Sequence, residues 1–315
     1  MDTPISSAAV VAGKSGWTGP FSFIQLADPQ FGCHAHMSGK TEEQVARYRE
    51  RGINVAAVPK FHGFEIESRL FRRAISEANR LETDFVVTCG DIVNRRGSEA
   101  QLREALTIAA ELDDGIPMHW VAGNHDVIDY YDGGWMRPTE ATLAVYRSRF
   151  GPDYYAFQHR GVSFVTLNSS LMCHLDEELE DHWRLQLRFL EAELEAARER
   201  GSVHTIVFVH YPFYLHHPDE DWSEEDWWEI GLVIPLERRR VVLDLFERYS
   251  VSAVFAGHTH KNYYTRHGTT QMVTSSAVGY PMGDDPPGYR IVRVFEDRID
   301  HDYHGFDDGP EVIEL

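Results

Sequence analysis

Five short apolar segments of this chain each end at an aspartate, asparagine or histidine, and this repetition limits the possible folds more than any other feature. The segments are FIQLA, FVVTC, MHWVA, TIVFV and AVFA. The residues that follow them are, in order, Asp28-Pro29-Gln30, Gly90-Asp91, Gly123-Asn124-His125-Asp126, His210 and Gly257-His258-Thr259-His260. Apolar runs of this length are typical of buried strands. Side chains just beyond the carboxyl ends of parallel strands meet at one edge of a sheet, so we predict that these polar residues form one site.

Amphipathic stretches alternate with the apolar segments, which predicts an α/β fold. Apolar residues at three- to four-residue spacing predict a helix over residues 65–81, and further helices are expected from Ser98 and over 139–150, 177–200 and 235–249. Additional strands are expected over 154–159, 161–167, 263–266, 271–275, 290–295 and 299–303. This order predicts a mostly buried mixed sheet covered by helices. We expect an N-terminal extension over residues 1–20 and a single domain over 21–315, because no repeat or low-complexity linker divides the chain.

The chain is strongly acidic, with 50 Asp and Glu against 30 Lys and Arg and a formal net charge of −20. Such a charge disfavours a nucleic acid or an anionic membrane as a partner, because both require a basic surface. An acidic enzyme that handles phosphate needs a compact local source of positive charge, for which metal ions are the obvious candidate. The three cysteines, Cys33, Cys89 and Cys173, do not form a disulfide framework. With no membrane span or signal peptide apparent, we expect a cytoplasmic location.

The donor set at the five strand ends favours a metal centre. It contains two Asp, one Gln, one Asn and three His. Oxygen and nitrogen donors without thiolates suit Mn, Fe, Zn or similar ions. A single Asp or His after a strand is usually a turn residue or a helix cap, but five such ends in one chain favour metal binding. If one carboxylate bridges, the set is large enough for two ions, which is the known arrangement for in-line phosphoryl hydrolysis.

These motifs, in this order, resemble those of the calcineurin-like metallophosphoesterases. The resemblance covers residues 21–303, and Ser275-Ser276-Ala277-Val278-Gly279, among other stretches, resembles the branch of calcineurin-like phosphoesterase domain-containing Ser/Thr phosphatases. The resemblance implies a four-layer α/β/β/α sandwich with two mixed β-sheets and a binuclear metal centre at the strand ends.

The resemblance also assigns ligands. It implies that one ion is held by Asp28, Gln30, Asp91 and His260, and that Asp91 bridges to a second ion held by Asn124, His210 and His258. Most of the superfamily has His where this chain has Gln30, and an amide is a weaker donor than imidazole. The two ions are expected to be Mn, Fe, Zn or Mg.

Two further residues of the third motif are candidate catalytic groups. The resemblance implies that His125 acts as the general acid or as a cationic stabiliser of the phosphoryl transition state. Asp126 either orients His125 or caps the segment that follows it. The Ser/Thr phosphatase loop has an Asp that partners the catalytic His at the position of Asn94. Arg95 and Arg96, which follow, either contact substrate phosphate or form a solvated pair before a helix.

Several neighbouring segments bear less clearly on the site. Cys33, His34 and His36 follow the first motif and are expected to lie in a loop without a ligand role, the alternative being that they line the pocket or bind another ion. Cys89 is expected to be a small buried hydrophobe. The segment 219–228 is rich in acidic residues and Trp, and a rim or lid over the metals is favoured slightly over a solvated loop. Residues 37–63 are a candidate second rim.

The sequence therefore predicts a binuclear metal-dependent phosphoesterase. The expected reaction is hydrolysis of phosphomonoesters, with phosphoserine or phosphothreonine in proteins as the expected substrate, by in-line attack of a metal-bridging hydroxide with His125 as the acid. The partner is then a phosphorylated protein or a small phosphoester. The alternative within enzymes is a phosphodiesterase or nucleotide hydrolase, because the same metal core supports both. A non-catalytic scaffold is disfavoured, because all seven ligand positions and His125 are filled.

Overall fold

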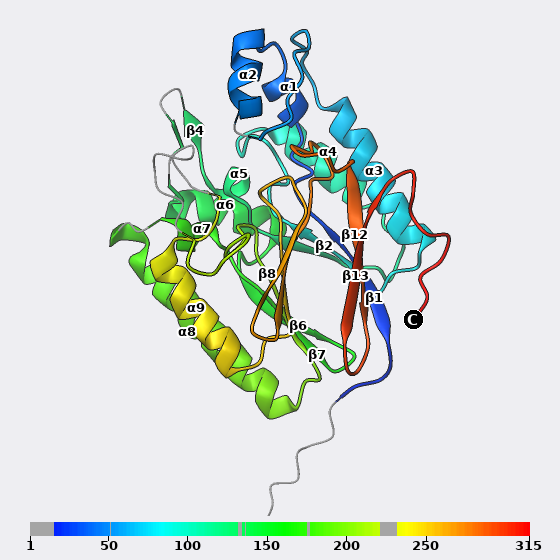
Figure 1. Cartoon of the computed structure of the whole chain (residues 1–315), viewed down its shortest axis with the longest axis vertical. Coiled ribbons are helices and arrows are strands. Elements are labelled where there is room, and N and C mark those ends of the chain that lie inside the picture. The colour runs from blue at the N-terminus through cyan, green and yellow to red at the C-terminus, as the bar shows by residue number, and fades with distance from the viewer. Residues whose placement is uncertain (1–15, 51, 132–133, 136, 175–176, 221–231) are drawn as a thin grey trace, which may run out of the picture.

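The computed structural model describes residues 16–50, 52–131, 134–135, 137–174, 177–220 and 232–315. Two β-sheets lie face to face at the centre of the molecule, and helices cover the outer face of each sheet (Figure 1). This arrangement is the expected four-layer α/β/β/α sandwich.

The first sheet contains the strands that carry the first three motifs. Its order is β13-β12-β1-β2-β3, in which β1, β2 and β3 run parallel and β12 and β13 are antiparallel additions. Because β1, β2 and β3 are parallel, their carboxyl ends lie along one edge. The bounds are β1 (Phe21–Leu26), β2 (Phe85–Cys89), β3 (Met118–Val121), β12 (Gly288–Val294) and β13 (Ile299–Gly305).

The second sheet carries the remaining two motifs. Its order is β10-β11-β9-β8-β7-β6, with β11, β9, β8 and β7 mutually parallel and antiparallel strands at both edges. The bounds are β6 (Tyr155–His159), β7 (Val162–Thr166), β8 (Thr205–Phe208), β9 (Ala253–Ala256), β10 (Tyr263–His267) and β11 (Thr270–Thr274). A separate small hairpin pairs β4 (Tyr130–Tyr131) with β5 (Gly134–Trp135).

The side-chain alternation of the strands builds three hydrophobic layers. On β1, Phe21 and Phe23 point between the sheets, whereas Ile24 and Leu26 point outward to the helices. On β9, Phe255 lies between the sheets and Val254 faces the helices of the other side. Strands buried on both faces read as continuous apolar runs rather than alternating ones, which is why the five segments were recognisable from the sequence.

Long helices cover both sheets where the spacing predicts them. The helices α3 (Glu65–Arg80), α4 (Glu99–Ala109) and α6 (Glu140–Phe150) cover the first sheet, and α8 (Glu177–Arg200) and α9 (Leu236–Arg248) cover the second (Figure 1). The Ser98 side chain caps α4 by accepting the backbone N–H of Gln101 at 3.4 Å, while the Gln101 side chain accepts the backbone N–H of Arg95. Among the described helices, none combines the length and apolarity needed to cross a bilayer.

Four short helices were not expected: α1 (Cys33–Met37), α2 (Glu42–Glu50), α5 (Asn124–Val127) and α7 (Ser170–Cys173). The loop placement of Cys33, His34 and His36 is therefore wrong, since all three lie in α1. A small core of its own, with Cys33, Val45 and Val55 among its members, holds α1 and α2 together and packs against Tyr280 and Met282. Residues 1–15 of the expected N-terminal extension lie outside the described residues. The domain boundaries stay a prediction.

Candidate metal centre

The seven predicted ligands converge from the two sheets. Each follows a parallel strand: Asp28 and Gln30 follow β1, Asp91 follows β2, Asn124 follows β3, His210 follows β8, and His258 and His260 follow β9. The hydrogen bond from the backbone N–H of His258 to Oδ2 of Asp28, at 2.9 Å, joins the strand ends of the two sheets directly.

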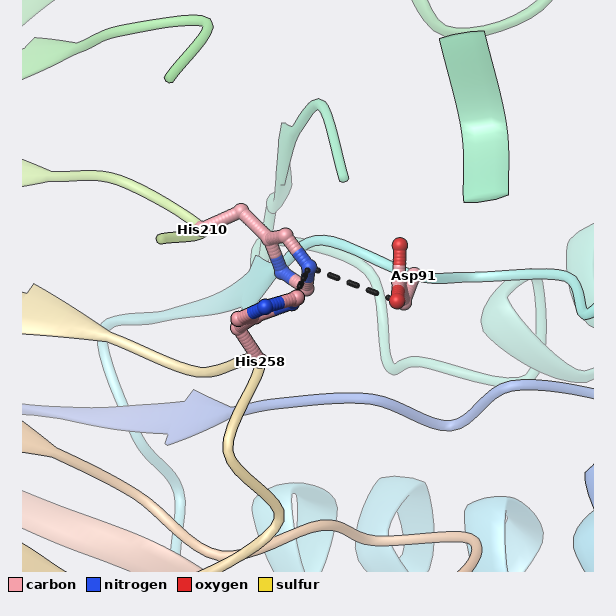
Figure 2. Close-up of side chains that lie close together, drawn as sticks. All are labelled: Asp91, His210 and His258. Carbon is pink, nitrogen blue, oxygen red and sulfur yellow. Dashed lines mark hydrogen bonds and ion pairs between the residues drawn. The ribbon is translucent and has the colours of Figure 1, made fainter. Parts of the chain in front are cut away.

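His210 is the centre of the first group of contacts. Its Nε2 lies 3.0 Å from Oδ1 of Asn124, 3.3 Å from Oδ2 of Asp91 and 3.2 Å from Nδ1 of His258. Figure 2 shows the side chains of Asp91, His210 and His258 turned toward one another from three different segments. One donor atom from each of these three residues lies within 4.8 Å of the others, a spacing that can hold a metal ion.

The second group consists of Asp28, Gln30 and His260. Nε2 of His260 lies 3.3 Å from Oδ1 of Asp28, and the exposed fractions of the three residues are 3% or less. Neither Oδ1 of Asp28 nor Oε1 of Gln30 has a hydrogen-bond donor, although both atoms are buried. Buried oxygens of this kind normally have a partner, because desolvation is costly. A cation would provide the missing partner for both, so the residues present fit a metal ion.

The backbone at the site is strained. Five of the predicted ligands are non-glycine residues with positive φ: Asp28 (49°), Gln30 (39°), Asp91 (51°), His258 (71°) and His260 (55°). Side chains disfavour this region, and such residues cluster at functional sites where the surrounding structure enforces them. The strain therefore concentrates where the donors converge.

Glycines beside the ligands allow the segments to approach closely. A Cβ at Gly123 would lie 2.1 Å from the backbone nitrogen of Asp91, and one at Gly257 would lie 2.6 Å from Oδ2 of Asp28. At Gly90, which has φ +80°, a Cβ would lie 2.4 Å from Nδ1 of His210. These distances are shorter than van der Waals contact, so the ligand geometry requires glycine at these positions.

Backbone carbonyls orient two of the imidazoles. Nδ1 of His210 donates to the carbonyl of Cys89 at 2.9 Å, and Nδ1 of His260 donates to the carbonyl of Tyr280 at 2.5 Å. A carbonyl only accepts hydrogen bonds, so Nδ1 of each ring carries a proton. Nε2 of each ring then faces the other predicted metal ligands. Such outer contacts fix the tautomer and orientation of metal-binding histidines.

The carboxylate and imidazole charges of the site depend on one another. Burial by itself would raise the pKa of Asp91, but the imidazoles of His210 and His125 hold that pKa well below its usual range. Burial likewise opposes protonation of His210, yet the Asp91 carboxylate raises the His210 pKa to about 9. The site is thus a buried carboxylate surrounded by imidazoles. A divalent cation can balance the charge of this carboxylate in place of the protons on the imidazoles.

His125 lies beside this group without being one of the predicted ligands. Its backbone N–H donates to Oδ1 of Asp91 at 2.8 Å, and its Nε2 lies 3.9 Å from Oδ2 of the same carboxylate. Nδ1 contacts the backbone carbonyl of Asn94 at 2.8 Å. Burial lowers the pKa of His125, and the Asp91 charge offsets only part of the effect.

Asp126 makes the contacts of a structural cap. Its Oδ1 accepts the backbone N–H groups of Ile92, at 3.0 Å, and Val93, at 3.3 Å, while Oδ2 accepts that of Gly123 at 2.9 Å. Burial, together with the nearby Asp91 charge, raises the pKa of Asp126 to about 8. Of the two roles expected for Asp126, these contacts favour the cap, and the contact that orients His125 is the Asn94 carbonyl, which the sequence did not indicate.

The two candidate substrate arginines differ. Arg96 is paired with Asp129, with its Nε 2.9 Å from Oδ1 and its Nη2 2.6 Å from Oδ2. Arg95 is exposed. Burial lowers the pKa of His36 to about 4, and Lys40 and, more weakly, Arg95 contribute to that shift. Arg95 is therefore the better placed of the two to contact a substrate.

Cys89 and the acidic segment 219–228 were the other residues considered near the site. Cys89 is fully buried, as expected, and burial raises its pKa to about 12. The acidic segment 219–228 lies outside the described residues from position 221 on. Of its first two residues, Asp219 pairs with Arg240 at 3.0 Å, and Glu220 accepts backbone N–H groups of residues 215–217. The carboxylate of Glu220 thus supports its own loop.

Comparison with known proteins identifies the family. The profile of the calcineurin-like phosphoesterase family matches residues 22–262. A zebrafish protein named Serine/threonine-protein phosphatase CPPED1 is 34% identical over 92% of this chain and 86% of its own length. The human protein of the same name is 31% identical over 95% of this chain and 88% of its own length. A crystal structure of a dimetal phosphatase from Danio rerio superimposes with a TM-score of 0.62 and 18% identity, over 92% of this chain and 97% of that one.

The chain belongs to the calcineurin-like phosphoesterase family. The resemblance drawn from the motifs is confirmed, as is the fold class, and the protein is a metal-dependent phosphatase. The family fold implies two metal ions.

Proposed function

We propose that this protein hydrolyses phosphomonoesters, with phosphoserine and phosphothreonine in proteins as its substrates, at a centre of two metal ions. The observation that carries the proposal is that seven side chains able to bind a metal ion converge from five strand ends. Two of these side chains, Asp28 and Gln30, each have a buried oxygen that accepts no hydrogen bond. The names of the zebrafish and human relatives support the substrate class.

In this proposal Asp91 serves both ions. Asp28, Gln30 and His260 complete one site, and Asn124, His210 and His258 complete the other. Carboxylate, amide and imidazole donors suit Mn, Fe, Zn or Mg. When bound, the ions supply positive charge that polarises the phosphoryl group and activates the attacking water. This would be the concentrated positive charge that a chain of net charge −20 otherwise lacks.

His125 protonates the leaving oxygen in this proposal. The Asn94 carbonyl holds the proton of Nδ1, so Nε2 is the atom that gives a proton to the departing serine or threonine alkoxide. His125 acts as the imidazolium, which carries a second proton on Nε2. Burial lowers the pKa of His125 and so makes that proton more acidic, while the Asp91 carboxylate opposes the shift and favours the protonated ring. Arg95, exposed beside this group, contacts the phosphate or an adjacent acidic group of the substrate.

A cytoplasmic location is part of the same proposal. Cys33, Cys89 and Cys173 are all free, and the first two are buried. Free thiols without any disulfide among them are typical of a reducing compartment.

A hydrolysis panel tests the proposal. Metal-stripped and Mn²⁺-reloaded protein is assayed with a phosphoserine peptide, an aryl phosphomonoester, an aryl phosphodiester and ATP, alongside the variants His210→Ala and His62→Ala. His62 is exposed and serves as the control for removal of an imidazole. The proposal predicts metal-dependent hydrolysis of both monoesters by the parent and by His62→Ala, and none by His210→Ala. Faster turnover of the diester or of ATP than of either monoester would establish the alternative activity.

A further inference from the structure

A five-residue strap, defined here as Ser275 to Gly279, connects the two halves of the metal centre. At its start, the backbone N–H of Ser275 donates to the carbonyl of Ala256 at 2.9 Å, at the end of β9. At its far end, the backbone N–H of Gly279 donates to the carbonyl of Asp28 at 3.1 Å. The strap therefore runs from the second sheet to the first, beside Asp28 of the second group of predicted ligands.

Between these ends, the strap contacts the loop that carries two of the histidines. Oγ of Ser276 donates to the carbonyl of His260 at 3.0 Å, and the backbone N–H of Ser276 donates to Oδ1 of Asn262 at 3.1 Å. Gly279 lies tightly against the first motif, since a Cβ there would lie 2.2 Å from the carbonyl oxygen of Pro29. The strap thus contacts the segments on both sides and leaves no space for a side chain at Gly279.

A buried arginine of β12 joins the strap to the histidine loop. The Arg290 guanidinium donates from Nε to Oγ of Ser275 at 2.7 Å, from Nη2 to Oδ1 of Asn262 at 2.8 Å and from Nη1 to Nδ1 of His301 at 3.0 Å. Arg290 is only 6% exposed, and burial lowers its pKa to about 10. These three acceptors are neutral. Burial of a cation is costly, and the Tyr303 ring, Asp302 and Asp285 offset only part of the effect of burial on the Arg290 pKa. The position of Arg290 between the strap and the histidine loop points to a role in holding them together.

We propose that Arg290 is a positioning residue for the metal centre. By holding Asn262 and Ser275 together, it fixes the segment from His258 to His260 relative to Asp28, so that both groups of ligands are spaced for two ions. The inference rests on the proposed function, because it requires metal ions at these ligands. The Ser-Ser-Ala-Val-Gly motif, which forms the strap, then has a physical role: it connects the position of the histidine loop to that of Asp28.

Metal affinity, measured by calorimetry with Mn²⁺, tests the role independently of catalysis. Lysine cannot reproduce the fork of the guanidinium, so Arg290→Lys is expected to bind Mn²⁺ about 10–100-fold more weakly, as outer-contact changes do. Asn262→Ala should weaken binding similarly, whereas Asn262→Asp keeps an acceptor for Arg290 and should restore it. The loss in the Arg290→Lys, Asn262→Ala double variant should be smaller than the sum of the two single losses, because both changes break the Arg290–Asn262 contact. Arg293→Lys, on the same strand and paired with Asp302, is the matched control.

The outcomes separate positioning from general stability. If the role is only structural, each single variant lowers the melting temperatures of the metal-free and the Mn²⁺-loaded protein equally and leaves the Mn²⁺ affinity unchanged. This result for both Arg290→Lys and Asn262→Ala would overturn the inference. Weaker binding by both variants and parent-like binding by Arg293→Lys and Asn262→Asp supports it. If the parent itself binds no Mn²⁺, the proposed function has failed, and the inference fails with it.

Discussion

The carboxylate of Asp91 lies 3.3 Å from Nε2 of His210 and also accepts the backbone N–H of His125. It therefore contacts a predicted ligand and the candidate acid at the same time. Both Asp91 and His210 are almost fully buried, at 2% and 0% exposed.

Removing the charge of Asp91 is expected to empty both metal sites. Asp91→Asn keeps the shape but weakens a donor that both ions share, so the variant should lose both ions, and turnover with them. Elemental analysis of the purified variant measures the retained metal per chain. Two ions retained per chain would contradict the bridging role of Asp91.

Replacement of His125 should separate metal binding from catalysis. His125→Ala is expected to keep its metal and lose roughly 10²–10⁴-fold in turnover, because general acids contribute this much. The loss should be smaller for aryl phosphates with acidic leaving groups, which need less protonation. If the loss is the same for all leaving groups, His125 stabilises charge instead of transferring a proton, and if metal is lost, His125 is a ligand.

A methyl group at Gly123 should disturb the centre from the backbone side. The added Cβ would meet the Asp91 nitrogen at 2.1 Å, so Gly123→Ala has to displace Asp91 and is expected to weaken Mn²⁺ binding. The matched control is Gly97→Ala, because a Cβ at Gly97 has nothing within 4 Å. Calorimetric titration of both variants provides the comparison, and equal affinities would mean that the close contact is not needed for the site.

Stability in mild acid should depend on His119, which lies away from the metal centre. Burial, helped by nearby His159, lowers the His119 pKa to about 4, against 6.5 for an unperturbed histidine. Between pH 6.5 and pH 4, His119 is protonated in the unfolded chain but not in the folded protein. The free energy of unfolding should therefore decrease as the pH is lowered from about 6.5 to about 4. Phenylalanine can replace the ring, which stacks on Phe157 at 3.7 Å between centroids. In His119→Phe, the pH slope of the unfolding free energy should decrease by up to about 1.4 kcal/mol per pH unit.

Urea unfolding at a series of pH values measures that slope, and His62→Phe, at an exposed position, is the control. An unchanged slope in His119→Phe would show that His119 does not titrate in the way proposed.

Local patterns predicted the strands well, and the structure brings the candidate ligands together at the strand ends, for a physical reason. Each motif lies within a few residues of its own strand, and a strand buried on both faces is recognisable by its continuous apolar run. The helix α2 was missed because it buries only Val45 against a small local core, so its sequence has little amphipathic signal.

The roles of Asp126 and Arg290 depend on contacts distant in the chain. Asp126 accepts backbone N–H groups 34 and 33 residues away, and Arg290 joins segments 15 and 28 residues away. Neither spacing leaves a periodic pattern in the sequence. Arg290 also lies in a strand with Arg293, and nothing local distinguishes the buried arginine that joins a polar network from the one that pairs at the surface.

Titration of Mn²⁺ into metal-stripped protein, with hydrolysis of a phosphoserine peptide followed at each step, tests the central claim most directly. The account predicts no turnover without metal and a rise that saturates when two ions are bound per chain. Full turnover of the peptide by the stripped protein, before any Mn²⁺ is added, would contradict it.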